Sequence, residues 1–135
     1  MTRIIIATLC DDVREEKSGK FSLIGLFNQF TVHDFRVPLP SFCIFATIGF
    51  DSPGNHPISI LFRRVEGDTI FKAESIHQIA VQDQATLQFP ALINLRLSNL
   101  TLPGVGRYEF AFECDGRYVG AIPVKVVQPP PRLVQ

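Results

Sequence analysis

The sequence predicts an all-β protein, an antiparallel β-sandwich of about eight strands. Three observations support this prediction. Apolar residues recur with a period of two along most of the chain, no segment carries a 3.6-residue helical stripe, and clusters of Pro, Gly, Asn and Asp separate the apolar runs. Short strands at regular spacing are typical of sandwiches and barrels.

The apolar pattern of two predicted strands indicates where each lies in its sheet. Residues 42–50 (FCIFATIGF) are apolar on nearly both faces, as in a strand that is covered on both sides. In residues 84–98 every second residue is apolar, and the residues between them are mostly polar. Pro90 lies in this stretch and indicates an edge strand or a bulge. The full set of predicted strands comprises residues 2–9, 20–30, 42–50, 57–65, 69–77, 84–98, 105–114 and 117–127.

Two short turns predict β-hairpins. The sequence "EGD" lies between the strands predicted at 57–65 and 69–77. In "CDGR", Asp115 and Gly116 supply the positive φ angles of a tight two-residue turn. Each turn therefore joins two neighbouring antiparallel strands.

A tyrosine motif makes the sandwich prediction more specific. The stretch "LPGVGRYEFAF" contains Gly106, Tyr108 and Phe110. In immunoglobulin-type sandwiches a tyrosine two residues before the disulfide cysteine donates its hydroxyl hydrogen to upstream backbone. Phe110 stands at the cysteine position here, and the chain has no tryptophan. We expect Tyr108 to be such a corner tyrosine in an immunoglobulin-like Greek key; an ordinary cross-strand aromatic is the alternative.

Composition narrows the classes of partner. Lys plus Arg and Asp plus Glu number 13 each, so no net charge attracts a nucleic acid or an anionic membrane. No stretch approaches the roughly 20 apolar residues of a membrane span. The three cysteines lack C-x-x-C spacing, which predicts reduced thiols in the cytoplasm rather than disulfides or zinc. We expect one domain, residues 1–127, and a proline-rich tail, residues 128–135.

The stretch "CDDVREEKSGK", residues 10–20, is the densest charged segment and allows two interpretations. Carboxylate oxygens are calcium ligands, and the weak candidates are Asp11, Asp12, Glu15 and Glu16. Neighbouring basic residues offset most of this acidic charge. Alternatively, Asp12 and Glu15 form a capping box for one helical turn that ends at Gly19, with the charges facing solvent.

Catalytic motifs are missing from the sequence. "SGK" lacks the earlier glycine of a phosphate-binding loop, "PGVG" lacks the third glycine of a dinucleotide fingerprint, and no G-x-S-x-G occurs. The three histidines do not adjoin a nucleophile motif. We therefore expect no enzyme activity and no cofactor, and name no catalytic residue.

Two segments resemble a known family. "LCDDVREEKSGKFSLIGLF" and "LPGVGRYEFAFECDGRYVGAIPVKV" are similar to the two ends of a family of small, uncharacterised bacterial domains, a domain of unknown function. The resemblance implies a cytosolic bacterial all-β domain. It implies no activity and no catalytic residues.

The function expected from the sequence is that of a non-catalytic structural or protein-interaction module. Because residues 42–50 are apolar on both faces, the outer face of that strand would need a protein partner, for which another copy of the chain would serve. One alternative is a β-sandwich that binds calcium or a small ligand through residues 10–20. The other is an enzyme whose site is assembled only by folding.

Overall fold

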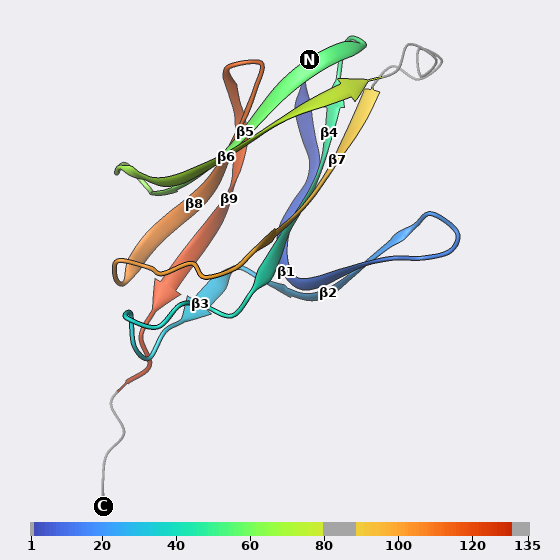
Figure 1. Ribbon diagram of the computed structural model, residues 1–135. Coiled ribbons are helices and arrows are strands. Elements are labelled where there is room, and N and C mark those ends of the chain that lie inside the picture. The colour runs from blue at the N-terminus through green and yellow to red at the C-terminus, as the bar shows by residue number, and fades with distance from the viewer. Residues whose placement is uncertain (1, 80–88, 131–135) are drawn as a thin grey trace, which may run out of the picture.

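The computed structural model describes residues 2–79 and 89–130, which form two packed β-sheets (Figure 1). One sheet has the order β2-β1-β4-β7 and the other β3-β9-β8-β5-β6. No helix that could cross a membrane occurs within the described ranges. The strands are β1 (Arg3–Glu15), β2 (Phe21–Phe27), β3 (Gln29–Thr31), β4 (Phe42–Phe50), β5 (Gly54–Arg64), β6 (Thr69–Ile79), β7 (Phe89–Leu97), β8 (Gly106–Cys114) and β9 (Arg117–Val127).

The predicted all-β, sandwich-like architecture is confirmed, but the strand predicted at residues 20–30 is split between the two sheets. Phe27 pairs with β1 in the four-stranded sheet, whereas Phe30 pairs with β9 in the other sheet. Asn28 lies at the crossing point, and its carbonyl accepts a hydrogen bond from the Lys125 amide at 3.0 Å. Phe27 and Phe30 both contact aromatic rings of the core although they are three positions apart, so the period-two pattern shifts by one residue at the crossing. The described residues therefore form nine strands rather than about eight.

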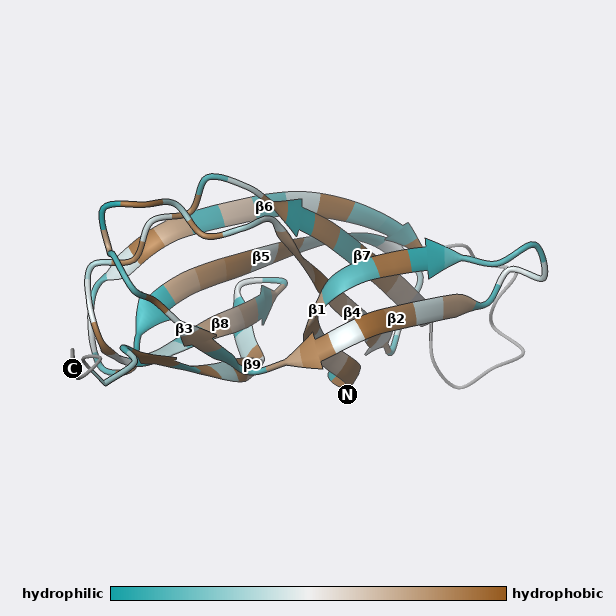
Figure 2. Ribbon diagram, turned by 90° about the horizontal axis from the view of Figure 1, so that it is seen from below, coloured by the Kyte–Doolittle hydropathy of each residue, from teal (hydrophilic) through white to brown (hydrophobic). Residues whose placement is uncertain are grey.

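The core lies between the sheets and contains a cluster of aromatic rings among aliphatic side chains. Phe110 is fully buried, with ring centroids 4.6 Å from Phe62 and 6.1 Å from Phe42. Phe30 adds a further ring 5.1 Å from Phe42. Figure 2 shows hydrophobic residues along the strands of both sheets. The period-two pattern places alternate side chains of each strand in this core.

Both predicted hairpins form. Strands β5 and β6 pair around residues 65–68. Strands β8 and β9 pair around Asp115 (φ 54°) and Gly116 (φ 79°), the positive angles expected of a two-residue turn. Strand β7 begins at Phe89, and residues 84–88 of its predicted range lie outside the described residues. It is an edge strand, as Pro90 indicates.

Tyr108 is anchored as the sequence predicts. Its hydroxyl donates a 2.6 Å hydrogen bond to the Gly104 carbonyl, four residues upstream and just before β8 begins at Gly106. The Tyr108 ring is fully buried, stacks on Phe62 at 5.4 Å, and has the Arg64 guanidinium 5.1 Å from its centre. This bond ties the connection between β7 and β8 to the core.

Replacing Tyr108 with Phe should lower the free energy of unfolding by about 1–2 kcal/mol, because the Gly104 carbonyl loses its donor. Urea denaturation followed by circular dichroism measures this change. Tyr118 is the matched control: it is the other tyrosine of the chain and is 58% exposed, so Tyr118→Phe should change stability by less than about 0.5 kcal/mol. Equal effects of the two substitutions would contradict the anchoring role.

Candidate functional site

The charged stretch at residues 10–20 forms a projecting β-hairpin, and the helical turn predicted for it is wrong. Strand β1 continues to Glu15, and β2 begins at Phe21 (Figure 1). The turn is closed by a 2.9 Å bond from the Gly19 amide to the Glu16 carbonyl. Residues 12–15 pair with β2, and this cross-strand pairing prevails over the local capping signal. We call residues 11–26 the arm.

Gly25 allows a close approach at the base of the arm. Its φ angle of 69° lies in the left-handed region that side chains disfavour. A Cβ atom at this position would also overlap Oδ2 of Asp11 and lie 2.7 Å from its Cγ. The Asp11 side chain therefore occupies the space that only glycine leaves open.

An ion pair joins the arm to the far edge of the four-stranded sheet. Arg96 of β7 donates from Nη2 to Oδ1 of Asp12 at 2.7 Å and from Nη1 to Oγ of Ser41 at 3.3 Å. Arg14 Nε lies 3.8 Å from Oδ2 of Asp12. The Asp12 and Arg96 side chains remain 42% and 47% exposed, so the pair contributes at most about 1 kcal/mol. Its role is to orient the arm.

The four acidic residues named from the sequence do not meet at one point. Asp11 lies over Gly25, Asp12 pairs with Arg96, Glu16 accepts from Ser22 at 2.9 Å, and Glu15 is exposed near the turn. Within residues 2–79 and 89–130 no group of three or more acidic, histidine or cysteine side chains could hold a metal ion. The arrangement lends no support to the calcium hypothesis.

A second apolar layer lies outside the sandwich core. Cys10, Cys43 and Phe45 are each at most 5% exposed, yet they are not part of the core cluster. Cys43 and Phe45 alternate with the core-facing residues of β4 and so point to the opposite face, and Cys10 of β1 pairs with Cys43. Phe21 of the arm covers this face, with its ring centroid 5.7 Å from that of Phe45. The chain itself thus buries the β4 face that we expected to require a partner.

The outer edge of β2 differs from the other sheet edges. The edge strands are β2, β7, β3 and β6. Strand β7 carries Pro90 and Arg96, β6 carries the paired Lys72 and Glu74, and β3 has three residues. Proline, charge and short length all discourage edge-to-edge pairing. Strand β2, by contrast, has seven residues (FSLIGLF) with no charge and no proline, and its Leu26 is 63% exposed.

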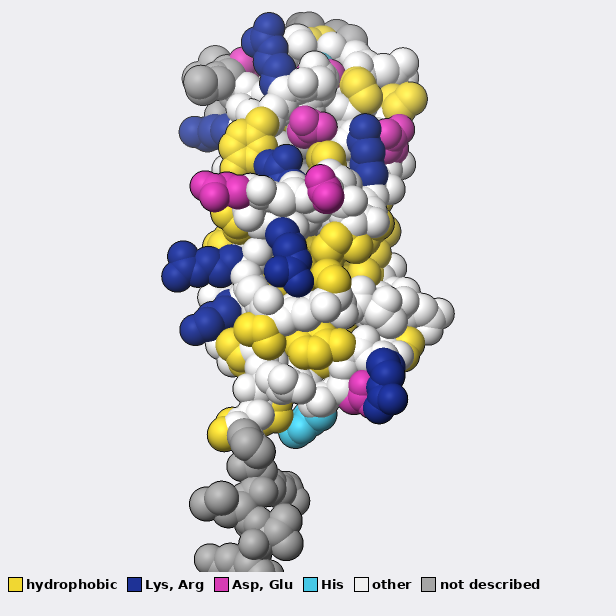
Figure 3. Space-filling view, turned by 90° about the vertical axis from the view of Figure 1, so that its left-hand side faces the viewer, with side chains coloured by type: hydrophobic (Ala, Val, Ile, Leu, Met, Phe, Trp, Pro, Cys, Tyr) yellow, Lys and Arg dark blue, Asp and Glu magenta, His cyan; other side chains and the backbone are white. Residues whose placement is uncertain are grey.

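The outer face of the five-stranded sheet presents mixed charges instead of one apolar patch (Figure 3). Arg63 donates from Nε to Oε1 of Glu109 at 2.9 Å across β5 and β8. Lys72 and Glu74 form another 2.9 Å pair on β6. Charges of both signs are interspersed between apolar side chains on this face, as on an ordinary solvated surface.

A cleft of about 610 Å³ at one end of the sandwich has several polar side chains in its lining. His56 lies beside it and bonds through Nδ1 to Oδ2 of Asp115 and through Nε2 to the Ser52 carbonyl, both at 2.8 Å. Its ring stacks on Phe50 at 4.2 Å. Both ring nitrogens therefore face protein acceptors, and His56 ties the β4–β5 connection to the β8–β9 turn. The lining includes Thr2, Arg3, Asp51, Cys114, Asp115, Arg117, Tyr118 and Val119.

Cys114 is poorly suited to act as a nucleophile in this cleft. Burial, and secondarily the Asp115 carboxylate, raise the pKa of its thiol to about 11. The thiol consequently stays protonated near neutral pH. His56 is already engaged through both nitrogens, so the two residues do not form an activated cysteine–histidine pair.

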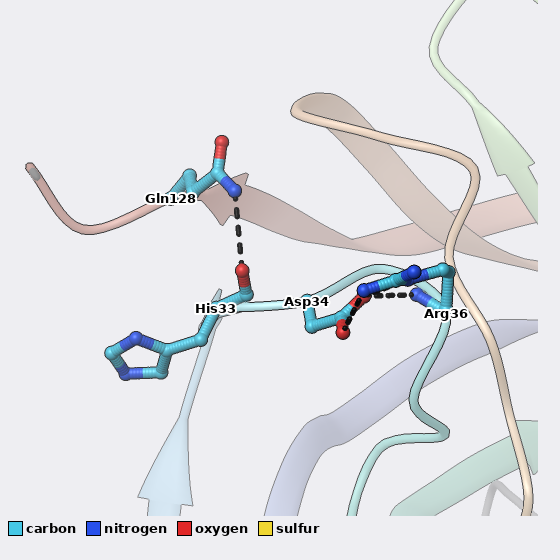
Figure 4. Close-up of polar contacts among 4 residues, drawn as sticks. All are labelled: His33, Asp34, Arg36 and Gln128. Carbon is cyan, nitrogen blue, oxygen red and sulfur yellow. Dashed lines mark hydrogen bonds and ion pairs between the residues drawn. The ribbon is translucent and has the colours of Figure 1, made fainter.

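The segment after β3 is held by local polar contacts (Figure 4). Arg36 donates from Nε and Nη2 to the two carboxylate oxygens of Asp34, each at 3.0 Å, and these bonds lower the pKa of that carboxyl. Gln128, the first residue of the predicted tail, donates to the His33 carbonyl at 3.3 Å. Residues 131–135 of that tail lie outside the described residues. These contacts shape the connection.

Sequence reasoning missed the residues that organise the arm. Arg96 is 84 positions from Asp12, and no motif links them. Cys10 and Cys43 face each other across β1 and β4, which only the strand register reveals. The available signal was the apolar composition of residues 42–50 on both faces, which implied some cover for the outer face.

Gly25→Ala should lower the free energy of unfolding by about 2–3 kcal/mol, because it combines a strained φ angle with the overlap on Asp11. Gly19→Ala is the matched control: Gly19 has a φ of 87° but nothing within 4 Å of a Cβ, so it should cost only about 1 kcal/mol. Denaturant unfolding compares the two. Indistinguishable losses would show that the contact with Asp11 does not constrain the arm.

Comparison with known proteins places the chain in a family. No curated protein matches it. A family model described as a family of unknown function, DUF6941, matches residues 5–127. This range includes the arm, both sheets and the two segments whose resemblance the sequence indicated. The chain therefore belongs to the family of unknown function DUF6941.

Proposed function

We propose that this protein is a non-catalytic interaction module that self-associates through β2. The observation that carries the proposal is the unprotected edge of β2. Within the described residues β2 pairs with β1 alone, and it is the edge strand without charge, proline or short length to discourage a further strand. Its Ile24 and Leu26 are 38% and 63% exposed.

A second copy of β2 is a suitable occupant of this edge. Two identical strands can pair antiparallel about a two-fold axis, which makes a closed, isologous dimer. With the axis at Ile24, each Phe21 would lie opposite Phe27 of the other copy, and the two four-stranded sheets would become continuous. The charged turn between β1 and β2 lies beyond the paired stretch and limits the pairing to these seven residues.

The proposal treats the sandwich as an immunoglobulin-like Greek key. Three features support it: the neighbours β5-β8-β9 in one sheet and β1-β4-β7 in the other, and the Tyr108 bond at the start of β8. Under this assignment β2 is an added edge strand beside the frame. An addition that projects from the frame and exposes apolar side chains is a reasonable place for partner binding.

The test is sedimentation velocity or light scattering of the full chain over a concentration series. Wild type should be dimeric, and Ile24→Lys should weaken the dimer at least about tenfold, since it sets like charges opposite each other. Ile76→Lys is the matched control, because Ile76 is a 72% exposed isoleucine on β6 of the other sheet. It should leave the dimer intact.

Three outcomes would reject the proposal: a wild-type monomer at several hundred micromolar, an unchanged dimer in Ile24→Lys, or equal weakening by Ile76→Lys. Circular dichroism and urea denaturation of each variant separate a lost interface from a lost fold. If wild type is monomeric, an interaction module of this kind would have to bind a protein other than a second copy of the chain.

A further inference from the structure

Cys10 and Cys43 lie directly opposite each other in the antiparallel β1–β4 ladder. Opposed residues in such a ladder have Cα atoms about 4.5–5.5 Å apart, and their side chains share a face. A disulfide requires a Cα separation of about 4.4–6.8 Å. The backbone therefore already holds the two thiols within the range of a cross-strand bridge.

We propose that Cys10 and Cys43 are a redox-active pair, which a peroxide oxidant converts into a cross-strand disulfide beneath the arm. One thiol loses its proton, and the resulting thiolate attacks a peroxide oxygen, which breaks the O–O bond and gives a sulfenic acid and hydroxide; the hydroxide takes up the lost proton to form one water. The second thiol also loses its proton, and its thiolate displaces hydroxide from the sulfenic acid sulfur to form the S–S bond; this hydroxide takes up that proton to form the second water. Overall, hydrogen peroxide is reduced to two waters, two S–H bonds are lost, and one S–S bond forms.

The arm controls access to this pair. Cys10 and Cys43 are 0% and 2% exposed, and they lie on the β4 face that Phe21 covers through Phe45. Burial, and secondarily the neighbouring Cys43, raise the pKa of the Cys10 thiol and slow its reaction in the closed state. Oxidation should therefore proceed when the arm lifts, and the pair of Asp12 and Arg96 holds it down.

Cys114 provides an internal control. It is buried in the sandwich core, and its partners across the two neighbouring strands are Ile58 and Arg117 rather than a cysteine. It should keep its thiol under conditions that join Cys10 to Cys43. The inference is independent of self-association through β2, because both cysteines belong to one chain.

The experiment treats the reduced full chain with hydrogen peroxide and maps its peptides without reduction by mass spectrometry. The expected product is a Cys10–Cys43 crosslink that lacks two hydrogens, with Cys114 still free. Reduction with dithiothreitol should reverse it, and Cys10→Ser should abolish it. Absence of the crosslink in wild type after exhaustive oxidation would overturn the proposal, as would crosslinks only between chains.

The role of the arm is tested by the rate of crosslinking. Asp12→Asn should raise that rate several-fold, because it releases Arg96. Asp34→Asn is the matched control, since it removes an exposed, arginine-paired carboxylate on the loop after β3, outside the arm. Equal rates in the two variants would overturn the gating role of the arm.

Discussion

Strand β4 is apolar on both faces, and both faces are buried within one chain. Ile44, Ile48 and Phe50 face the second sheet, whereas Cys43 and Phe45 face the opposite way. A fully buried side chain of this size contributes about 1.5–3 kcal/mol relative to an exposed one. A two-layer sandwich alone would leave the outer face in water. The arm closes that face, and the arrangement of β1 and β2 follows from this requirement.

The inner side of the arm packs on the sheet, whereas its outer side is a free strand edge. Its inner side carries Phe21 and Asp12, which contact Phe45 and Arg96. Its outer side is the open edge of β2, where Ile24 and Leu26 remain exposed. The same hairpin therefore covers the sheet face with its inner side chains and leaves the backbone of β2 unpaired at its outer edge. The proposed self-association and the proposed thiol chemistry arise from these two sides.

The features that sequence reasoning predicted are those with local causes. The turn at Asp115 needs positive φ angles that its own residues supply, and the Tyr108 bond spans only four positions. The features that it missed depend on distant partners. The crossing at Asn28 shifts the apolar alternation by one residue, and its cause is the pairing of Phe30 with the distant strand β9.

The misread capping box has a similar cause. Asp12 and Glu15 have the spacing of a helix start, but β2 offers the backbone an extended partner, and Arg96 binds the Asp12 carboxylate. The sequence identified residues 10–20 as the densest charged segment of the chain. Its character was not predictable, because the neighbours of that stretch are set by strand register rather than by local spacing.

The most direct test of this account is a double-mutant cycle on Phe21 and Phe45, measured by denaturant unfolding. Phe21→Leu, Phe45→Leu and the double variant should give a coupling energy of about 1 kcal/mol, as expected for two aromatic rings in contact. Additive effects, with a coupling energy near zero, would show that the arm does not close the outer face of β4 and would contradict the account.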